Sequence, residues 1–120
     1  MDAREQQVRG FYEAFNARDA DTLMAVMVED VDWPNGWEGG RVHGRAAVRD
    51  YWRRQWAEIH PSVTPTGFTA LDAHRVAVDV DQVIRSLSGD LLTEGHVKHV
   101  YTFDDDNLVV RMDIEEWRQT

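Results

Sequence analysis

Cysteine is absent from the 120-residue sequence, which excludes a disulfide framework and thiolate chemistry. No stretch approaches the roughly 18 consecutive apolar residues of a membrane-spanning helix. The first residues, Met-Asp-Ala-Arg-Glu, contain no apolar run, so we expect no signal peptide. From these absences we expect a soluble, cytoplasmic protein with no membrane partner.

Basic residues are also scarce, with 13 Lys and Arg against 22 Asp and Glu, a formal net charge of -9. Binding to a nucleic-acid backbone depends on clustered Lys and Arg, so we expect no nucleic-acid partner. Apolar residues make up 42% of the chain and include five Trp and four Phe, enough for a packed core. The length predicts a single domain over residues 1–120.

Apolar residues recur at helical spacing in three segments of the N-terminal half. The spacing predicts a helix over residues 4–17, a short second helix with Asp21 as its N-cap, and a third helix over residues 45–59. The inward faces of the first and third helices carry Val8, Phe11, Tyr12 and Phe15, and Val48, Tyr51, Trp52, Trp56 and Ile59. Pro61 ends the third helix.

The C-terminal half alternates in the manner of strands. We predict strands over residues 62–69, 75–87, 92–103 and 108–117, with turns at 88–90 and 104–107. Helices followed by strands predict an α+β fold, in which three helices cover one face of a curved sheet.

Residues 30–44 separate these two halves. This stretch contains Trp33, Trp37, Pro34 and four glycines, and it begins with a short predicted strand over residues 31–33. Tryptophan rings in a turn-rich crossing need an apolar surface to cover, which indicates the mouth of a cavity.

Strand alternation assigns side chains to the two sheet faces. Val97, His99, Tyr101 and Phe103 share the inward face of their strand, and Met112, Ile114 and Glu116 share one face of the last strand. The middle strand has two interpretations. In the first, Val76, Val78 and Val80 form core and the acids are solvated. In the second, which the family resemblance given below implies, the valines pack in a dimer interface, and Asp79, Asp81, Val83 and Arg85 face the cavity.

The chain resembles the nuclear transport factor 2-like superfamily, in its SnoaL-like and ketosteroid isomerase-like branch. The likeness rests on residues 8–19, on residues 23–33, on His-Gly-Arg-Ala-Ala-Val at 43–48 and on His-Val-Tyr-Thr-Phe at 99–103. The resemblance implies a cone-shaped barrel, a strongly curved antiparallel or mixed sheet around an apolar cavity, and a homodimer.

Three positions differ from ketosteroid isomerase. The family's general-base aspartate falls at Asn35, its tyrosine donor at Phe11 with Tyr12 next to it, and its protonated aspartate at His99. An amide cannot abstract a proton from carbon, so the resemblance does not predict steroid isomerisation by that mechanism.

Two functions remain open from the sequence. The first is a cofactor-independent isomerase, cyclase, dehydratase or hydrolase that acts on an apolar or polycyclic small molecule. His99 would be its acid/base, and Asp81 would orient His99. The second is a non-catalytic module that binds a lipophilic ligand or only dimerises. Each of these residues also has a simpler interpretation. His99 would be a hydrogen-bonded core histidine, Asp81 a solvated carboxylate, and Asn35 a turn-forming residue.

In either function, the cavity would be lined by aromatic and polar side chains. The predicted ligand contacts are Asn35, Trp33, Trp37, Tyr51, Trp52, Phe11, Tyr12, Tyr101, Phe103 and Met112. The five histidines are scattered, so we expect no metal site.

Overall fold

The computed structural model describes residues 3–119, without the side chains of residues 116, 117 and 119. The elements of this part of the chain follow in the order α1 (Ala3–Asn16), α2 (Ala20–Ala25), β1 (Met27–Pro34), β2 (Arg41–His43), α3 (Arg45–Glu58), β3 (Ile59–Ala70), β4 (Arg75–Ser86), β5 (Leu91–Phe103) and β6 (Val109–Gln119). None of the described helices is long and apolar enough to cross a membrane.

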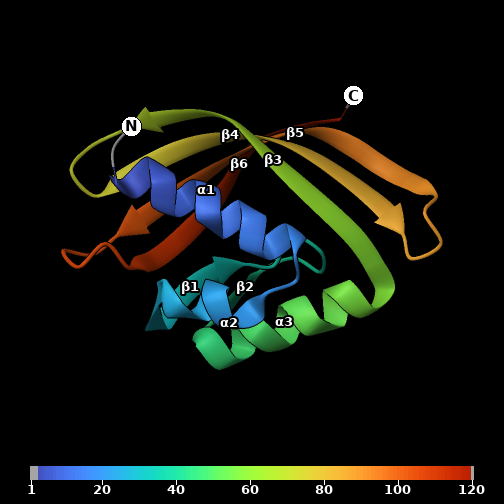
Figure 1. Ribbon diagram of the computed structural model, residues 1–120, viewed down its shortest axis with the longest axis horizontal. Coiled ribbons are helices and arrows are strands. Elements are labelled where there is room, and N and C mark those ends of the chain that lie inside the picture. The colour runs from blue at the N-terminus through green and yellow to red at the C-terminus, as the bar shows by residue number, and fades with distance from the viewer. Residues whose placement is uncertain (1–2, 120) are drawn as a thin grey trace.

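The strands form one mixed sheet in the order β2-β1-β6-β5-β4-β3. β1 runs parallel to β6, and the other neighbours are antiparallel. Figure 1 shows the long strands β3, β4 and β5 arching over α1, while α3 lies across from them beside β1 and β2. The sheet therefore curls around the helices without closing, which confirms the predicted α+β fold with a strongly curved sheet.

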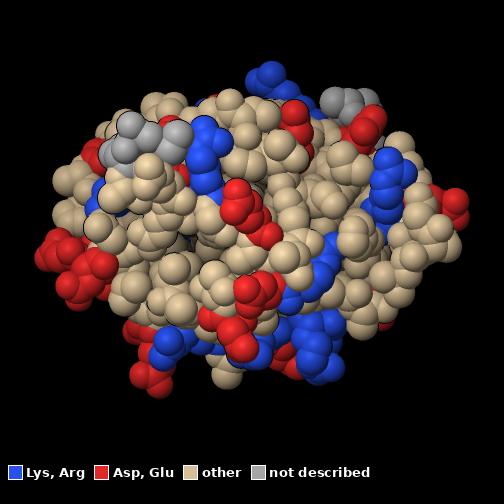
Figure 2. All heavy atoms as spheres, viewed as in Figure 1, with Lys and Arg blue, Asp and Glu red and all other residues tan. Residues whose placement is uncertain are grey.

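The helices pack through the apolar faces that their spacing predicts. α1 buries Val8, Phe11 and Tyr12, and α3 buries Tyr51 and Trp52. Three of the four arginines of α3 form ion pairs. Arg49 lies 2.7 Å from Asp21, Arg53 2.7 Å from Asp50, and Arg54 3.1 Å from Glu38. Side chains of both signs accordingly lie together along the lower edge of the molecule, where Figure 1 places α3 (Figure 2).

Asp19, and not the predicted Asp21, is the N-cap of α2. Arg18 has a left-handed backbone with φ of 61°, so the chain turns one residue before Asp19. The Asp19 carboxylate accepts hydrogen bonds from the Thr22 backbone N–H at 3.3 Å and from the Thr22 hydroxyl at 2.6 Å. These bonds lower the pKa of Asp19. Asp21 falls inside the first turn, where its negative charge is favourable but caps no backbone group.

The stretch over residues 30–44 contains more regular structure than the sequence predicts. β1 begins at Met27, and Arg41–His43 forms an additional short strand antiparallel to it. The turn between them is closed by hydrogen bonds from Asn35 N to Gly40 O and from Gly39 N to Asn35 O. Gly44 then starts α3 with φ of 91°, a conformation that favours glycine, and its N–H donates to Val31 O.

The burial of side chains on the middle strand, β4, shows which of its faces belongs to the core. Val78 and Val80 are fully buried, and Val76 is 7% exposed. The interpretation that turned Asp79, Asp81, Val83 and Arg85 toward the cavity is therefore wrong, because burial of alternating valines fixes the phase of β4.

β3 also runs longer than predicted, and starts directly after α3. It tolerates Pro61 and Pro65 because it is the edge strand of the sheet.

Candidate functional site

A cavity of about 500 Å³ lies between the concave face of the sheet and the helices α1 and α3. Small-molecule sites usually have volumes of about 300–1,000 Å³, so this space fits one small ligand. Residues from α1, β1, the following turn, α3 and β3 to β6 line it: Phe11, Tyr12, Phe15, Trp33, Pro34, Gly36, Trp37, Tyr51, Trp52, Gln55, Ile59, Pro61, Val63, Gln82, Ile84, Thr93, Val97, His99, Tyr101, Met112 and Ile114.

The walls are mainly aromatic. The rings of Trp33 and Trp52 meet edge to face with centroids 5.4 Å apart, and Phe11 lies 5.6 Å from Trp33. Tyr101 lies 5.8 Å from Phe11 and completes the cluster. Such packing holds each ring in one orientation, so the wall is rigid.

Nine residues of the predicted site line the cavity, and three do not. Those that line it are Phe11, Tyr12, Trp33, Trp37, Tyr51, Trp52, His99, Tyr101 and Met112. Phe103 is buried elsewhere in the core, where the Arg4 guanidinium lies 4.8 Å from its ring centroid. Asp81 and Asn35 are the other two. The side chain of Glu116, predicted to share the face of Met112, lies outside the described residues.

A chain of three buried polar side chains faces the cavity. Tyr101 donates its hydroxyl proton to the Tyr12 hydroxyl oxygen at 2.9 Å, and the Tyr12 hydroxyl lies 2.7 Å from Nδ1 of His99. Tyr12 accepts from Tyr101, so its own proton is available to Nδ1 of His99, which is the acceptor when it receives that proton. The neutral imidazole therefore carries its proton on Nε2.

Nε2 of His99 is the end of this chain that a ligand can reach. This nitrogen has no hydrogen-bond partner among the described residues. It is also absent from the fully buried side-chain atoms that lack a partner, so it is accessible. Since the ring lines the cavity, the Nε2–H group is available to a bound molecule as a donor.

Burial keeps all three groups uncharged. It lowers the pKa of His99 to about 4, and it raises the pKa of Tyr101 and of Tyr12 well above their ordinary values. At neutral pH the site therefore offers hydrogen bonds without carrying a charge.

Asp81 does not orient His99, contrary to the prediction. It is on the outer face of β4, and its carboxylate lies 3.4 Å from Nδ1 of His96. The other ring nitrogen of His96 lies 3.3 Å from Asp79. The alternating buried valines of β4 place both acids outside. The orienting partner of His99 is instead the Tyr12 hydroxyl, a role that was not predicted from the sequence.

Asn35 serves the turn after β1. Its side-chain oxygen accepts from Trp37 N at 3.2 Å and from Glu38 N at 2.7 Å, and its amide donates to the Glu38 carboxylate at 3.1 Å. Hydrogen bonds from Asn35 and from Arg54 lower the pKa of Glu38, and the Arg54 contact ties the turn to α3. Asn35 thus builds the wall that carries Trp37 and does not itself line the cavity.

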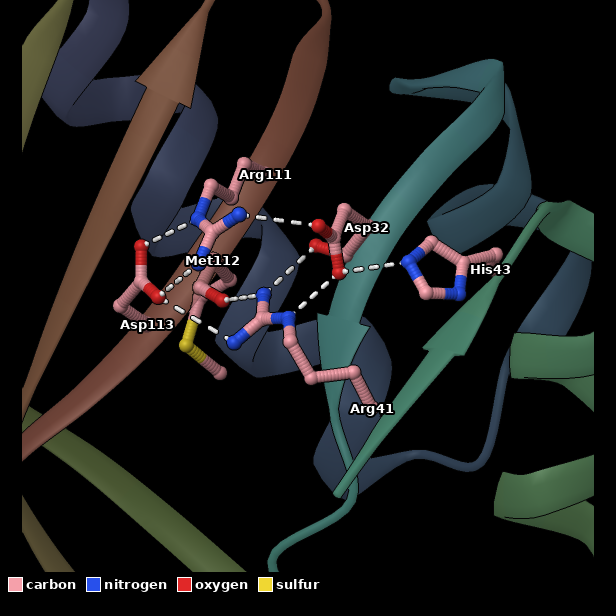
Figure 3. A network of polar contacts seen from close by, with 6 residues as sticks. All are labelled: Asp32, Arg41, His43, Arg111, Met112 and Asp113. Carbon is pink, nitrogen blue, oxygen red and sulfur yellow. Dashed lines mark hydrogen bonds and ion pairs between the residues drawn. The ribbon is translucent and has the colours of Figure 1, made fainter.

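Behind the cavity wall, an ion-pair network joins β1, β2 and β6 on the outer face of the sheet (Figure 3). Arg41 donates to Asp32, to Asp113 at 3.2 Å and to the Met112 carbonyl at 2.6 Å. Arg111 donates to Asp32 at 2.9 Å and to Asp113 at 2.8 Å. The network spans the parallel β1–β6 seam, whose inner side carries Trp33 and Met112, and it was not predicted.

The lining is electrically neutral. No Asp, Glu, Lys or Arg lines the cavity among the residues that the structure describes. Within the same residues, no group of His, Asp and Glu is arranged to hold a metal ion.

The curved sheet, the helices across its open side and the aromatic cavity define a small-molecule pocket protein of the cone type. A model of the SnoaL-like domain matches residues 8–112, and the chain belongs to this family. No curated protein matches the sequence.

Solved structures share the fold at low sequence identity. An NTF2-like protein of unknown function from Burkholderia pseudomallei is similar with a TM-score of 0.82 and 24% identity, over 96% of this chain and 91% of that one. A putative polyketide cyclase from Xanthomonas campestris pv. campestris has a TM-score of 0.76 and 24% identity, over 92% and 87%. A Mycobacterium tuberculosis protein in complex with estradiol-17β-hemisuccinate has a TM-score of 0.79 and 17% identity, over 92% and 90%.

Proposed function

We propose that the protein is a cofactor-independent enzyme, of the isomerase or cyclase kind, which binds an apolar, polycyclic carbonyl compound in this cavity. The observation that carries the proposal is the hydrogen-bonded chain Tyr101–Tyr12–His99, which ends in a donor inside an aromatic cavity. The similar M. tuberculosis protein, solved with a steroid derivative, and the putative polyketide cyclase support a ligand of this class.

His99 would act as a hydrogen-bond donor to the carbonyl oxygen. As an α-proton leaves the substrate carbon for a water molecule, negative charge develops on that oxygen, and the Nε2–H group stabilises it. Full proton transfer from His99 is unfavourable, because its replacement through Tyr12 would leave a phenolate on Tyr101, whose pKa burial raises. The low pKa of His99 also makes it a weak base, so the role differs from the acid/base role predicted from the sequence.

Binding and carbonyl activation can be measured separately. Binding of 4-phenylphenol and of biphenyl can be measured by quenching of tryptophan fluorescence, since Trp33, Trp37 and Trp52 line the cavity. We expect 4-phenylphenol to bind more tightly than biphenyl, and His99→Leu to remove the difference. For activation, we expect the protein to accelerate exchange of the α-protons of 1-tetralone in D₂O, and His99→Gln to reduce the acceleration at least about tenfold.

A non-catalytic binder of the same ligand class is the second candidate. The neutral lining favours it, because no described lining residue is a carboxylate that could take a proton from carbon. A binder would bind 4-phenylphenol with the same dependence on His99 and would leave the exchange of 1-tetralone at the buffer rate. That result would rule out the enzymatic proposal and retain the binding one.

We also propose that the protein is cytoplasmic and that it forms a homodimer, and the family resemblance supports the homodimer. Light scattering after size-exclusion chromatography would show twice the mass of 13.9 kDa for a dimer, and the single-chain mass would reject it.

A further inference from the structure

Two glutamine side chains belong to the lining of the cavity. Gln55 projects from α3 and Gln82 from β4, and both are half-buried residues of the lining. No hydrogen bond joins either amide to another described residue. Trp37 and Ile114, which are 36% and 41% exposed, also line the cavity.

Both glutamines lie on elements displaced from His99 toward the same end of the sheet. Gln55 is in the last turn of α3, which leads directly into β3, where Ile59 pairs with Ser86 of β4.

On the sheet, His99 pairs with Val78, and Gln82 follows Val78 by four residues on the same inward face. Four residues of strand span about 13 Å. The pair Val80 and Val97 lies between them, so the wall from one polar end to the other is apolar.

The polar groups at both ends are uncharged. A buried charge needs a counter-charge, and the described lining residues provide none. A glutamine amide has both a donor and an acceptor, so it can bind a hydroxyl or a carbonyl oxygen equally. The cavity is therefore complementary to a neutral, elongated molecule with an oxygen at each end.

We infer that Gln55 and Gln82 form a second recognition site, for the distal hydroxyl or carbonyl oxygen of a neutral ligand whose first oxygen meets His99. The inference rests on the proposed function, because it takes the His99 end of the ligand as given. Gln55 and Gln82 then determine specificity for the length and the oxygen pattern of the ligand, and they take no part in the carbonyl activation.

Two rigid rods test this arrangement, 4-phenylphenol with one hydroxyl and 4,4′-dihydroxybiphenyl with one at each end. A neutral hydrogen bond is worth about 1 kcal/mol, so we expect the second hydroxyl to tighten binding about fivefold in the wild-type protein. Gln82→Leu and Gln55→Leu should each reduce that gain and together remove it. Neither should change the affinity for 4-phenylphenol more than about twofold, because the first hydroxyl meets only His99.

Gln6→Leu, on the exposed face of α1, is the matched control and should leave both affinities unchanged. A third rod, 4′-hydroxybiphenyl-4-carboxylate, places a charge at the glutamines and should bind less tightly than the diol. Thermal unfolding of each variant checks that it is folded.

The inference is overturned alone if 4-phenylphenol binds in a His99-dependent manner but the diol binds no more tightly. It is also overturned if the glutamine variants weaken both rods equally, since the amides would then only shape the cavity. If folded protein binds neither phenol, the proposed function fails together with it.

Discussion

The hydroxyl of Tyr12 lies 2.7 Å from Nδ1 of His99, and both residues are almost completely buried at the inner end of the cavity. The two residues are 87 positions apart in the sequence, one on α1 and the other on β5. Their rings are nearly parallel, with an interplanar angle of 11°. This contact fixes the protonation of the imidazole and so determines what the cavity offers to a ligand.

Tyr12→Phe should release His99 from a single tautomer. The variant removes the proton that Nδ1 accepts and leaves a buried ring nitrogen unpaired, so we expect a loss of about 1–3 kcal/mol in the free energy of unfolding. Nitrogen-15 NMR of labelled histidine should show the Nε2–H tautomer in the wild-type protein and a mixture in the variant. Tyr101→Phe keeps the Tyr12–His99 contact and serves as the control. A wild-type spectrum with the proton on Nδ1 would refute the assignment of Tyr12 as the donor to His99.

Stability should fall in acid because of His99. Its pKa is 6.5 when unperturbed and about 4 in the folded protein, so between these values the unfolded chain binds a proton that the folded protein does not. The contribution of the neutral His99 to the free energy of unfolding is therefore fully present above pH 6.5. It is lost as the pH falls toward 4, and the total loss is about 3 kcal/mol. Tyr12 and Tyr101, its hydrogen-bonded neighbours, stay neutral throughout this range.

Urea unfolding of wild type and His99→Gln at several pH values would isolate this effect, since Gln can still accept from Tyr12 but does not titrate. The difference between the two proteins should change with pH between 6.5 and 4 and be constant above 7. Parallel curves over the whole range would contradict the lowered pKa of His99.

Local pattern was sufficient to predict the helices, most strands and most of the aromatic wall. Helical spacing placed Phe11 and Trp52 inward, and period-two alternation placed His99 and Tyr101 on the core face of β5, because burial of one face fixes the phase of an element. The α+β fold and the curved sheet follow from the same patterns and from the family resemblance.

Contacts between distant segments could not be predicted in this way. The sequence did not identify Tyr12 as the partner of His99, because the crossing of α1 over β5 is a property of the fold. Asp81 was predicted to orient His99 if it faced the cavity, and the alternating valines of β4 were the signal against that. The alternation that turns Met112 inward also turns Arg111 and Asp113 outward, which was the available signal for the outer network.

The cap of α2 offers a direct comparison of the two aspartates before and within that helix. Asp19→Ala removes the acceptor for the Thr22 N–H and should lower the free energy of unfolding by about 0.5–2 kcal/mol. Asp21→Ala removes an exposed ion pair with Arg49 and a negative charge in the first turn of α2, each worth about 0–1 kcal/mol, but no hydrogen bond to the helix backbone. Chemical denaturation of both variants would decide between them, and an equal or larger loss at Asp21 would argue against Asp19 as the cap.

Arg41→Met should weaken both the seam and the cavity wall behind it. Arg41 is the residue that joins β2 to Asp32, Asp113 and the Met112 carbonyl, and its side chain is only 27% exposed. Removing it leaves a carbonyl and two carboxylates without their shared donor, so we expect a loss of about 1–2 kcal/mol after allowance for solvent screening.

The matched control for this change is Arg53→Met on α3, whose ion pair with Asp50 is largely exposed and should contribute less than about 0.5 kcal/mol. Because the Met112 carbonyl is held by Arg41 while its side chain lines the cavity, Arg41→Met should also lower the affinity for 4-phenylphenol, and Arg53→Met should not. Fluorescence titration at a temperature where both variants are folded separates the two effects. A lower stability with unchanged affinity would show that the network supports the sheet without positioning the cavity wall.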